Sequence, residues 1–113
     1  NDYNRAQGTD VQIAVAKAKA DIEKALMLSS QNAYLHYDMG NILAANKEYD
    51  EAIKQYNSAI NINPYLAEAY YNRGLAYILN GKKAEGVESL SKAGELGLYD
   101  AYSVIKQNSK EAK

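Results

Sequence analysis

Apolar side chains recur every three or four residues along most of the chain, the spacing typical of one face of an α-helix. The pattern also repeats over a longer distance, because residues 33–66 and 67–100 are two copies of one 34-residue unit. Identical residues at this offset include the pairs Ala33 and Ala67, Tyr37 and Tyr71, Gly40 and Gly74, and Ala59 and Ala93. A period of this length predicts an all-α stack of antiparallel helix pairs rather than a compact enzyme fold.

Small and large residues alternate in this pattern in a way that explains the packing. Glycine and alanine are expected where one helix crosses another, because a side chain there would hold the backbones apart. These positions are Gly40, Ala52, Ala59, Gly74 and Ala93. Large residues at helical spacing are expected to fill the space around them: Leu43, Ile53, Tyr56, Ile60, Tyr77 and Leu90.

The residues that carry the period resemble the tetratricopeptide repeat. The first unit reads His36-x-x-Met39-Gly40-x-x-Leu43, then Ala52-x-x-x-Tyr56, Ala59 and Pro64. The second reads Tyr70-x-x-Arg73-Gly74-x-x-Tyr77, then Gly86-x-x-x-Leu90 and Ala93. The family pattern has Trp at the first large position, Ala where Gly86 stands and Pro where Leu98 stands. None of these departures adds bulk where helices must approach closely, so the resemblance implies a superhelix of helical hairpins.

The flanking segments extend the array to about two and a half repeats in a single domain of 113 residues. Residues 1–32 are predicted to form a partial repeat, with its second helix over Val11 to Leu28. We expect Gly8-Thr9-Asp10 to form a turn and cap before that helix, which leaves residues 1–7 as a frayed remnant of the first one. Residues 101–113 are predicted to form a capping helix, since a stack needs a terminal helix with one polar face.

Composition restricts the classes of partner. Thirteen basic and fourteen acidic residues give a formal net charge of −1, so no basic excess favours nucleic acid or an anionic membrane. Short, interrupted apolar stretches predict a soluble chain without membrane insertion. Cysteine is absent, which excludes disulfides and thiolate metal sites. The chain begins with Asn1, so a processed product and an excised fragment are both open, and cytoplasmic, periplasmic and secreted locations remain alternatives.

No catalytic constellation is visible in the sequence, and neither a cofactor nor a metal is expected. His36 is the one histidine and occupies a packing position of the motif, so a structural role is favoured over a catalytic one. The neighbouring carboxylates Asp50 and Glu51 lie at a predicted helix start, where acidic residues complement the helix dipole. Glycine-rich phosphate motifs are missing.

The family resemblance implies a concave groove lined by the first helix of each unit. Its inward positions are Tyr34, Tyr37, Asn41, Glu68, Tyr71, Leu75, Tyr102 and Ile105, with small or apolar residues further along at Ala44, Ala45, Ile78 and Leu79. Eleven tyrosines but no phenylalanine or tryptophan occur in the chain, and Tyr3, Tyr37 and Tyr71 recur once per unit. This tyrosine series either contacts a ligand or packs between helices, and the sequence leaves both open.

Some relatives bind an acidic C-terminal peptide through two asparagines and three basic residues on these inner faces. Asn41 and Asn72 match the two asparagines, and Lys106 stands near one basic position, but Tyr37 and Tyr102 occupy the other two. A carboxylate would lose its charge-assisted hydrogen bonds there, so we do not expect this mode. For Arg73 the sequence favours a stem packed along its helix, with the guanidinium at the surface or paired with a glutamate.

These observations predict a scaffold for protein–protein interaction that binds a peptide or partner helix in a tyrosine-lined groove. The predicted contact residues are Tyr34, Tyr37, Asn41, Tyr71, Asn72, Leu75, Ile78 and Tyr102. The alternative is self-association into a homo-oligomer through the same apolar face, with Ile78 and Leu79 beside Tyr71.

Overall fold

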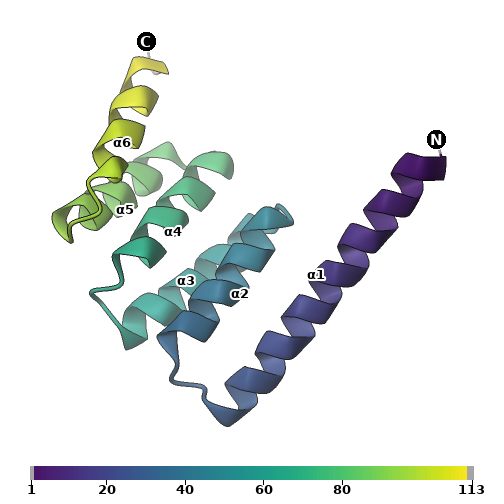
Figure 1. The fold of residues 1–113 in the computed structure, drawn as a ribbon. Coiled ribbons are helices and arrows are strands. Elements are labelled where there is room, and N and C mark those ends of the chain that lie inside the picture. Colours follow the sequence, from purple (N-terminus) through teal and green to yellow (C-terminus); the bar gives the residue numbers. More distant parts are fainter. Residues whose placement is uncertain (1, 112–113) are drawn as a thin grey trace.

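The computed structural model describes residues 2–111, with side chains from Asp10 to Ser109. Over this part of the chain the fold is all-α, with six helices and no strand. The helices are α1 (Asp2–Leu28), α2 (Ala33–Ala45), α3 (Tyr49–Ile62), α4 (Ala67–Leu79), α5 (Lys83–Glu95) and α6 (Asp100–Glu111). Figure 1 shows α2 with α3 and α4 with α5 as successive hairpins, flanked by α1 and α6. The predicted all-α repeat fold is therefore confirmed.

The turn inside each of the two hairpins uses one residue with positive φ. Lys47 (φ 63°) lies between α2 and α3, and Gly81 (φ 81°) occupies the equivalent position between α4 and α5. In both turns the backbone N–H of the third residue past the helix donates to a carbonyl of the last helical turn: Glu48 to Leu43 and Lys82 to Tyr77, each at 2.8 Å. This left-handed cap satisfies carbonyls that the helix end leaves without partners.

The predicted turn at Gly8-Thr9-Asp10 is wrong, because α1 is one continuous helix from Asp2 to Leu28. A glycine inside a helix costs only about 1 kcal/mol and does not break it alone. The 34-residue register instead places the turn residue at Ile13, which is equivalent to Lys47 and Gly81. A β-branched residue is a severe outlier at positive φ, so the chain continues as helix where the other two hairpins turn back.

Two glycine crossings set how closely the hairpins pack. A methyl group on Gly40 would lie 2.6 Å from Cε1 of Tyr56, so the ring of Tyr56 rests directly on the α2 backbone. In the next hairpin Gly74 and Gly86 face each other, since a methyl on either would lie within 2.9 Å of the other's carbonyl oxygen. The prediction of small residues at helix crossings is confirmed at these sites. The motif's alanine would not fit at Gly86 without a shift, because its methyl would also lie 2.6 Å from Cγ1 of Ile78.

Buried apolar residues form three neighbouring clusters along the stack. The first joins α2 and α3 around Tyr56, with Met39, Leu43, Ala52, Ile53 and Ala76. The second lies around Ala59 and Leu66, and the third joins α4, α5 and α6 around Leu90. Leu98, at the position of the motif's proline, packs against the third cluster. Each helix pair thus depends on its neighbours for cover, as expected of a repeat stack.

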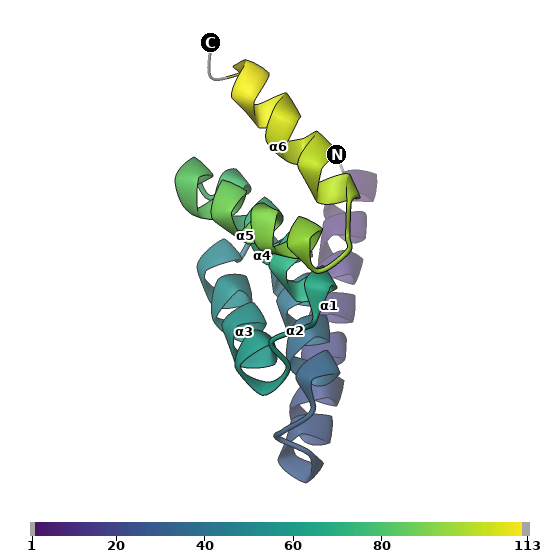
Figure 2. The same cartoon turned by 90° about the vertical axis from the view of Figure 1, so that its left-hand side faces the viewer.

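Helix α6 covers the far end of the stack, as Figure 2 shows from the side. Its buried residue Ala101 belongs to the third cluster, and Val104 and Ile105 pack against it. The predicted capping helix at 101–113 corresponds to α6, apart from residues 112 and 113, which lie outside the described part of the chain.

Candidate functional site

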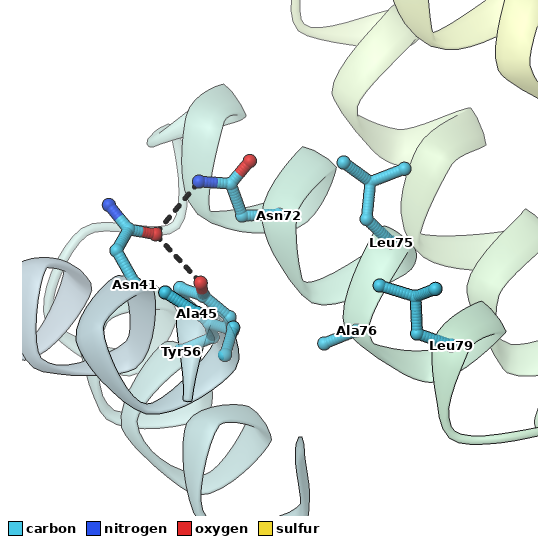
Figure 3. A pocket seen from close by; sticks show the side chains of 8 residues that line it. Asn41, Ala45, Tyr56, Asn72, Leu75, Ala76 and Leu79 are labelled. Atoms are coloured by element: carbon cyan, nitrogen blue, oxygen red, sulfur yellow. Dashed lines mark hydrogen bonds between the residues drawn. The ribbon is translucent and has the colours of Figure 1, made fainter. Parts of the chain in front are cut away.

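A groove lies between α2 and α4, with α3 at its floor. It has a volume of about 350 Å³. We name it the α2–α4 groove, and its lining residues are Asn41, Ala44, Ala45, Tyr56, Asn72, Leu75, Ala76 and Leu79. None of these eight residues carries a charge. Figure 3 shows Asn41 facing Asn72 at one end and the leucine side chains of α4 along the other.

The polar end of the groove is a short hydrogen-bond chain. The Tyr56 hydroxyl donates to Oδ1 of Asn41 at 2.7 Å, and Nδ2 of Asn72 donates to the same oxygen at 2.8 Å. Asn72 Nδ2 also donates to the Tyr37 hydroxyl at 3.0 Å. Asn41 Oδ1 accepts two bonds, whereas Asn41 Nδ2 and Asn72 Oδ1 make no hydrogen bond among the described residues. The polar end thus has one amide donor on Asn41 and one amide acceptor on Asn72, and the hydrogen bond between the two side chains lies between them (Figure 3).

Two tyrosine side chains are bonded to this amide pair through their hydroxyl groups. Tyr37 and Tyr56 lie with their ring centroids 6.1 Å apart at an interplanar angle of 50°, a tilted aromatic contact. Tyr56 is 1% exposed. Burial, and secondarily the neighbouring Tyr37, raises the pKa of Tyr56 above its ordinary value, so the hydroxyl remains a donor across the physiological pH range.

The apolar end of the groove is open to solvent. Leu79 is 66% exposed although it is a large apolar residue, and Ala45 beside it is also exposed. Leu75 is half-buried and lies between Leu79 and the amide pair. Removing such surface from water is favourable by roughly 25 cal/mol per Å². This end is therefore suited to receive an apolar side chain.

The structure brings some of the predicted contact residues together. Asn41, Asn72 and Leu75 line the groove, and Tyr37 touches its polar end through the bond from Asn72. Tyr37 also packs against the first and second clusters, so it is partly an interhelical packing residue.

Other predicted residues lie elsewhere. Ile78 was expected in the groove, but its side chain packs over Gly86 on α5, where glycine leaves room for it. Tyr71 packs against the third cluster, and the Tyr102 ring lies over Gly94 on α5. Tyr34 is 57% exposed and does not line the groove. The tyrosine series expected from Tyr37 and Tyr71 is thus divided between different packing environments.

Two lining residues of the groove, Tyr56 and Ala76, were not expected there. Tyr56 was expected to fill space between helices, and it does, but its hydroxyl reaches the groove. Ala76 was not singled out at all, although it lines the floor of the groove. Helical spacing could have identified Ala76, because it lies one turn after Asn72 on α4 and therefore on the same face of the helix.

Arg73 ties three helices together on the other side of α4. Its Nε donates to Ser89 Oγ on α5 at 3.0 Å, and its Nη1 donates to Asn57 Oδ1 on α3 at 2.9 Å. The guanidinium carbon lies 5.3 Å from the Tyr70 ring centroid and 5.9 Å from that of Tyr77, within cation–π range. The guanidinium was expected at the surface or paired with a glutamate, and it bonds instead to the neutral side chains of Ser89 and Asn57. Ser89, which is 1% exposed, has its hydrogen bond supplied by Arg73.

His36 and the helix-start carboxylates are accounted for by local contacts. Nδ1 of His36 lies 3.0 Å from Gln55 Oε1 and its Nε2 lies 3.0 Å from the carbonyl of Ser30, so the ring connects α2 to α3 and to the preceding loop. Asp50 and Glu51 occupy the first turn of α3, as predicted. Within the side chains that the structure describes, no three His, Asp or Glu residues gather as a metal site. No described helix is long and apolar enough to cross a membrane.

The hairpins, the glycine crossings and the groove between first helices together define a helical-repeat scaffold. Models of known protein families match two overlapping segments of the chain. A model described as "TPR repeat" matches residues 40–81, and a second, "Tetratricopeptide repeat", matches residues 67–96. The chain belongs to the tetratricopeptide repeat family, whose members are in general protein–protein interaction modules.

Curated relatives carry the same repeat in longer proteins. Photosystem I assembly protein Ycf3 of Acaryochloris marina is 31% identical over 94 residues, which is 80% of this chain and 57% of the relative. An Hsp70-Hsp90 organizing protein of Triticum aestivum is 38% identical over 80 residues, which is 71% of this chain and 14% of the relative. The chain thus spans little more than half of one of these relatives and a small part of the other.

Solved structures show the same fold. A crystal structure of MamA protein is 31% identical with a TM-score of 0.70, covering 78% of this chain and 48% of that one. The first TPR of Spaghetti (RPAP3), bound to the HSP90 peptide SRMEEVD, superimposes with a TM-score of 0.82 over 96% of this chain and 88% of that one. Its identity is 19%, so this likeness concerns the fold alone.

Proposed function

We propose that this chain binds a short extended segment of a partner protein in the α2–α4 groove. The observation that carries the proposal is the pairing of an uncommitted amide donor and acceptor with an exposed apolar trough in one groove. An extended segment presents N–H groups that need acceptors and C=O groups that need donors, and Asn72 Oδ1 and Asn41 Nδ2 offer one of each. The adjacent trough at Leu75 and Leu79 accommodates an apolar side chain of the same segment.

The absence of charge among the lining residues favours a neutral, apolar segment over an acidic one. Charge-assisted hydrogen bonds are roughly twice as strong as neutral ones, and an acidic peptide would find none in this groove. Burying one leucine-sized side chain contributes about 2 kcal/mol. The peptide SRMEEVD, which is bound in the RPAP3 structure, is therefore expected to bind this chain weakly. The proposal assigns the chain a scaffold role and no catalytic step.

A peptide selected from a random phage-displayed library would test the proposal. Its dissociation constant is measured by fluorescence anisotropy with the wild type, Leu79→Glu and Leu28→Glu. Leu28 is 91% exposed on α1 and is a matched control for adding a carboxylate to an exposed leucine. We expect Leu79→Glu to weaken binding at least tenfold, about 1.4 kcal/mol, and Leu28→Glu to leave it unchanged. Equal effects of the two variants would refute the assignment of the groove.

Self-association through the same apolar face is the alternative that the sequence raised. Its expected patch included Ile78, which packs on α5 instead. The remaining exposed apolar residue in that region is Leu79, so the Leu79→Glu variant also tests this alternative. A peptide whose affinity falls as the protein concentration rises would indicate that another copy competes for the groove.

A further inference from the structure

Helix α1 has one face without a helical partner. Its second half, residues 15–28, is equivalent to α3 in the 34-residue register. The α3 residues Ala52, Tyr56 and Ala59 are at most 1% exposed, because α2 covers one side and α4 the other. Their counterparts on α1 are Ala18, Ile22 and Ala25, and all three are only partly buried. Helix α1 contacts α2 and lacks, among the described helices, the first helix of its own hairpin.

The sequence of that missing first helix is present in α1 itself. Residues 3–6 read Tyr-Asn-Arg-Ala, and residues 71–74 of α4 read Tyr-Asn-Arg-Gly at twice the repeat offset. The first half of α1 therefore carries the sequence of a first helix, joined without a turn to the second. Figure 1 shows the consequence, because this half of α1 extends beyond the other helices instead of folding back.

Folding back within the chain requires a turn at Ile13. Both equivalent turns use a residue with positive φ, Lys47 and Gly81, and a β-branched residue is disfavoured there. When a hairpin turn is replaced by a straight helix, the first helix cannot pack on its own second helix but can pack on the second helix of another copy. This exchange of identical elements between protomers is domain swapping. The partner that can supply a first helix with this sequence is a second copy of the same chain.

We propose that two copies pair through antiparallel α1 helices, each first half covering the other's second half. The register makes this pairing self-complementary. In the two hairpins the corresponding contacts are Gly40 with Tyr56 and Gly74 with Leu90. Shifted back by one repeat, Gly40 and Tyr56 correspond to residue 6 and Ile22, so residue 6 of one copy is placed level with Ile22 of the other. The two-fold axis then passes near Ile13 and Ala14. Such an interface is closed, so a dimer forms and not a filament.

Charge and size agree with this pairing. In the second hairpin Arg73 donates to Ser89, and the same register places Arg5 opposite Asp21 of the other copy. An acidic residue thus stands where the hairpin has a neutral acceptor, and the pair is of opposite charge. In the sequence, alanine stands at residue 6 where the hairpins have a glycine, and isoleucine stands at residue 22 where α3 has the larger Tyr56.

Light scattering coupled to size exclusion tests the pairing on the full 113-residue chain. The wild type is expected to be a dimer at high micromolar concentration. A variant with Gln12→Asn, Ile13→Gly and Ala14→Lys copies the turn Asn80-Gly81-Lys82, and it is expected to fold back and become a monomer with unchanged helicity. Ala20→Gly, at an exposed position of the same helix, is the control and stays dimeric. A wild-type monomer at every concentration overturns the proposal, and so does a dimer that survives the new turn.

Disulfide formation tests the geometry independently, because the chain has no cysteine. Ala14 lies one turn before Ala18 on the face assigned to the interface, and next to the two-fold axis, whereas Ala20 points to another side of α1. Both are exposed alanines in the described chain. Under mild oxidation Ala14→Cys is expected to cross-link between copies at least tenfold faster than Ala20→Cys. Equal rates, or faster cross-linking of Ala20→Cys, overturn the pairing.

Discussion

Replacing Gly40 by alanine is expected to destabilise the fold, although alanine is the better helix former. The new methyl would lie 2.6 Å from Cε1, 2.7 Å from Cδ1 and 3.0 Å from Cζ of Tyr56. Carbon atoms in ordinary contact are about 3.5–4.0 Å apart, so ring and backbone must separate by about 1 Å. The ring cannot swing aside freely, because Tyr56 is buried and its hydroxyl is bonded to Asn41 at 2.7 Å.

The expected size of the effect follows from three contributions. Overpacking a well-filled core costs about 1–3 kcal/mol, and losing the Tyr56–Asn41 bond costs about 1 kcal/mol. Alanine in place of glycine returns about 1 kcal/mol of helix propensity. The net loss is about 1–3 kcal/mol, which lowers the melting temperature by roughly 4–12 °C for a domain of this size.

Urea denaturation followed by circular dichroism measures this loss, with thermal melts as a second readout. Ala20→Gly is the control, since it makes the reverse exchange at an exposed position and is expected to cost at most about 1 kcal/mol. A Gly40→Ala variant that is as stable as the wild type, or more stable, would show that the close approach of Tyr56 does not constrain residue 40.

Three further variants probe other contacts. Lys47→Gly removes a side chain from a residue at φ 63° and is expected to stabilise the fold by about 0.5–1 kcal/mol in urea titrations. Arg73→Leu leaves buried Ser89 without its donor and is expected to cost about 2 kcal/mol, whereas adding Ser89→Ala recovers part of that loss in a double-mutant cycle; simple additivity would contradict the tie. Hydrogen bonds from Asn46 and then Lys19 lower the pKa of Glu48, so its contribution is present above the ordinary carboxyl pKa and disappears as pH falls through the folded-state pKa. Glu48→Gln should therefore slightly reduce the loss of folding stability at acid pH when urea titrations are repeated at several pH values. An unchanged dependence of stability on pH would mean that these bonds contribute nothing.

The repeated units could be predicted from the sequence because their signals are local and redundant. Gly40 and Gly74 mark crossings in equivalent places, and the large residues follow at helical spacing. The structure agrees with this pattern in both hairpins. Helix α1 could not be predicted in the same way, since its course depends on the φ value that one residue, Ile13, can adopt.

The candidate site was predicted only in part, for a geometric reason. Adjacent residues on a helix point about 100° apart, so an error of one position moves a side chain from one face to the next. Ile78 and Leu79 illustrate this, because Ile78 packs on Gly86 while Leu79 faces the groove. The hydrogen bond between Asn41 and Asn72 joins residues 31 positions apart, and it depends on how two hairpins stack.

The most direct test of the proposed function is a ¹⁵N NMR titration of the chain with the selected peptide. The side-chain amides of Asn41 and Asn72 are expected to shift most, together with the backbone amides of Ala45, Leu75 and Leu79. Shifts confined to the opposite side of α4, around Arg73, or to α6 would contradict the assignment of the α2–α4 groove as the binding site.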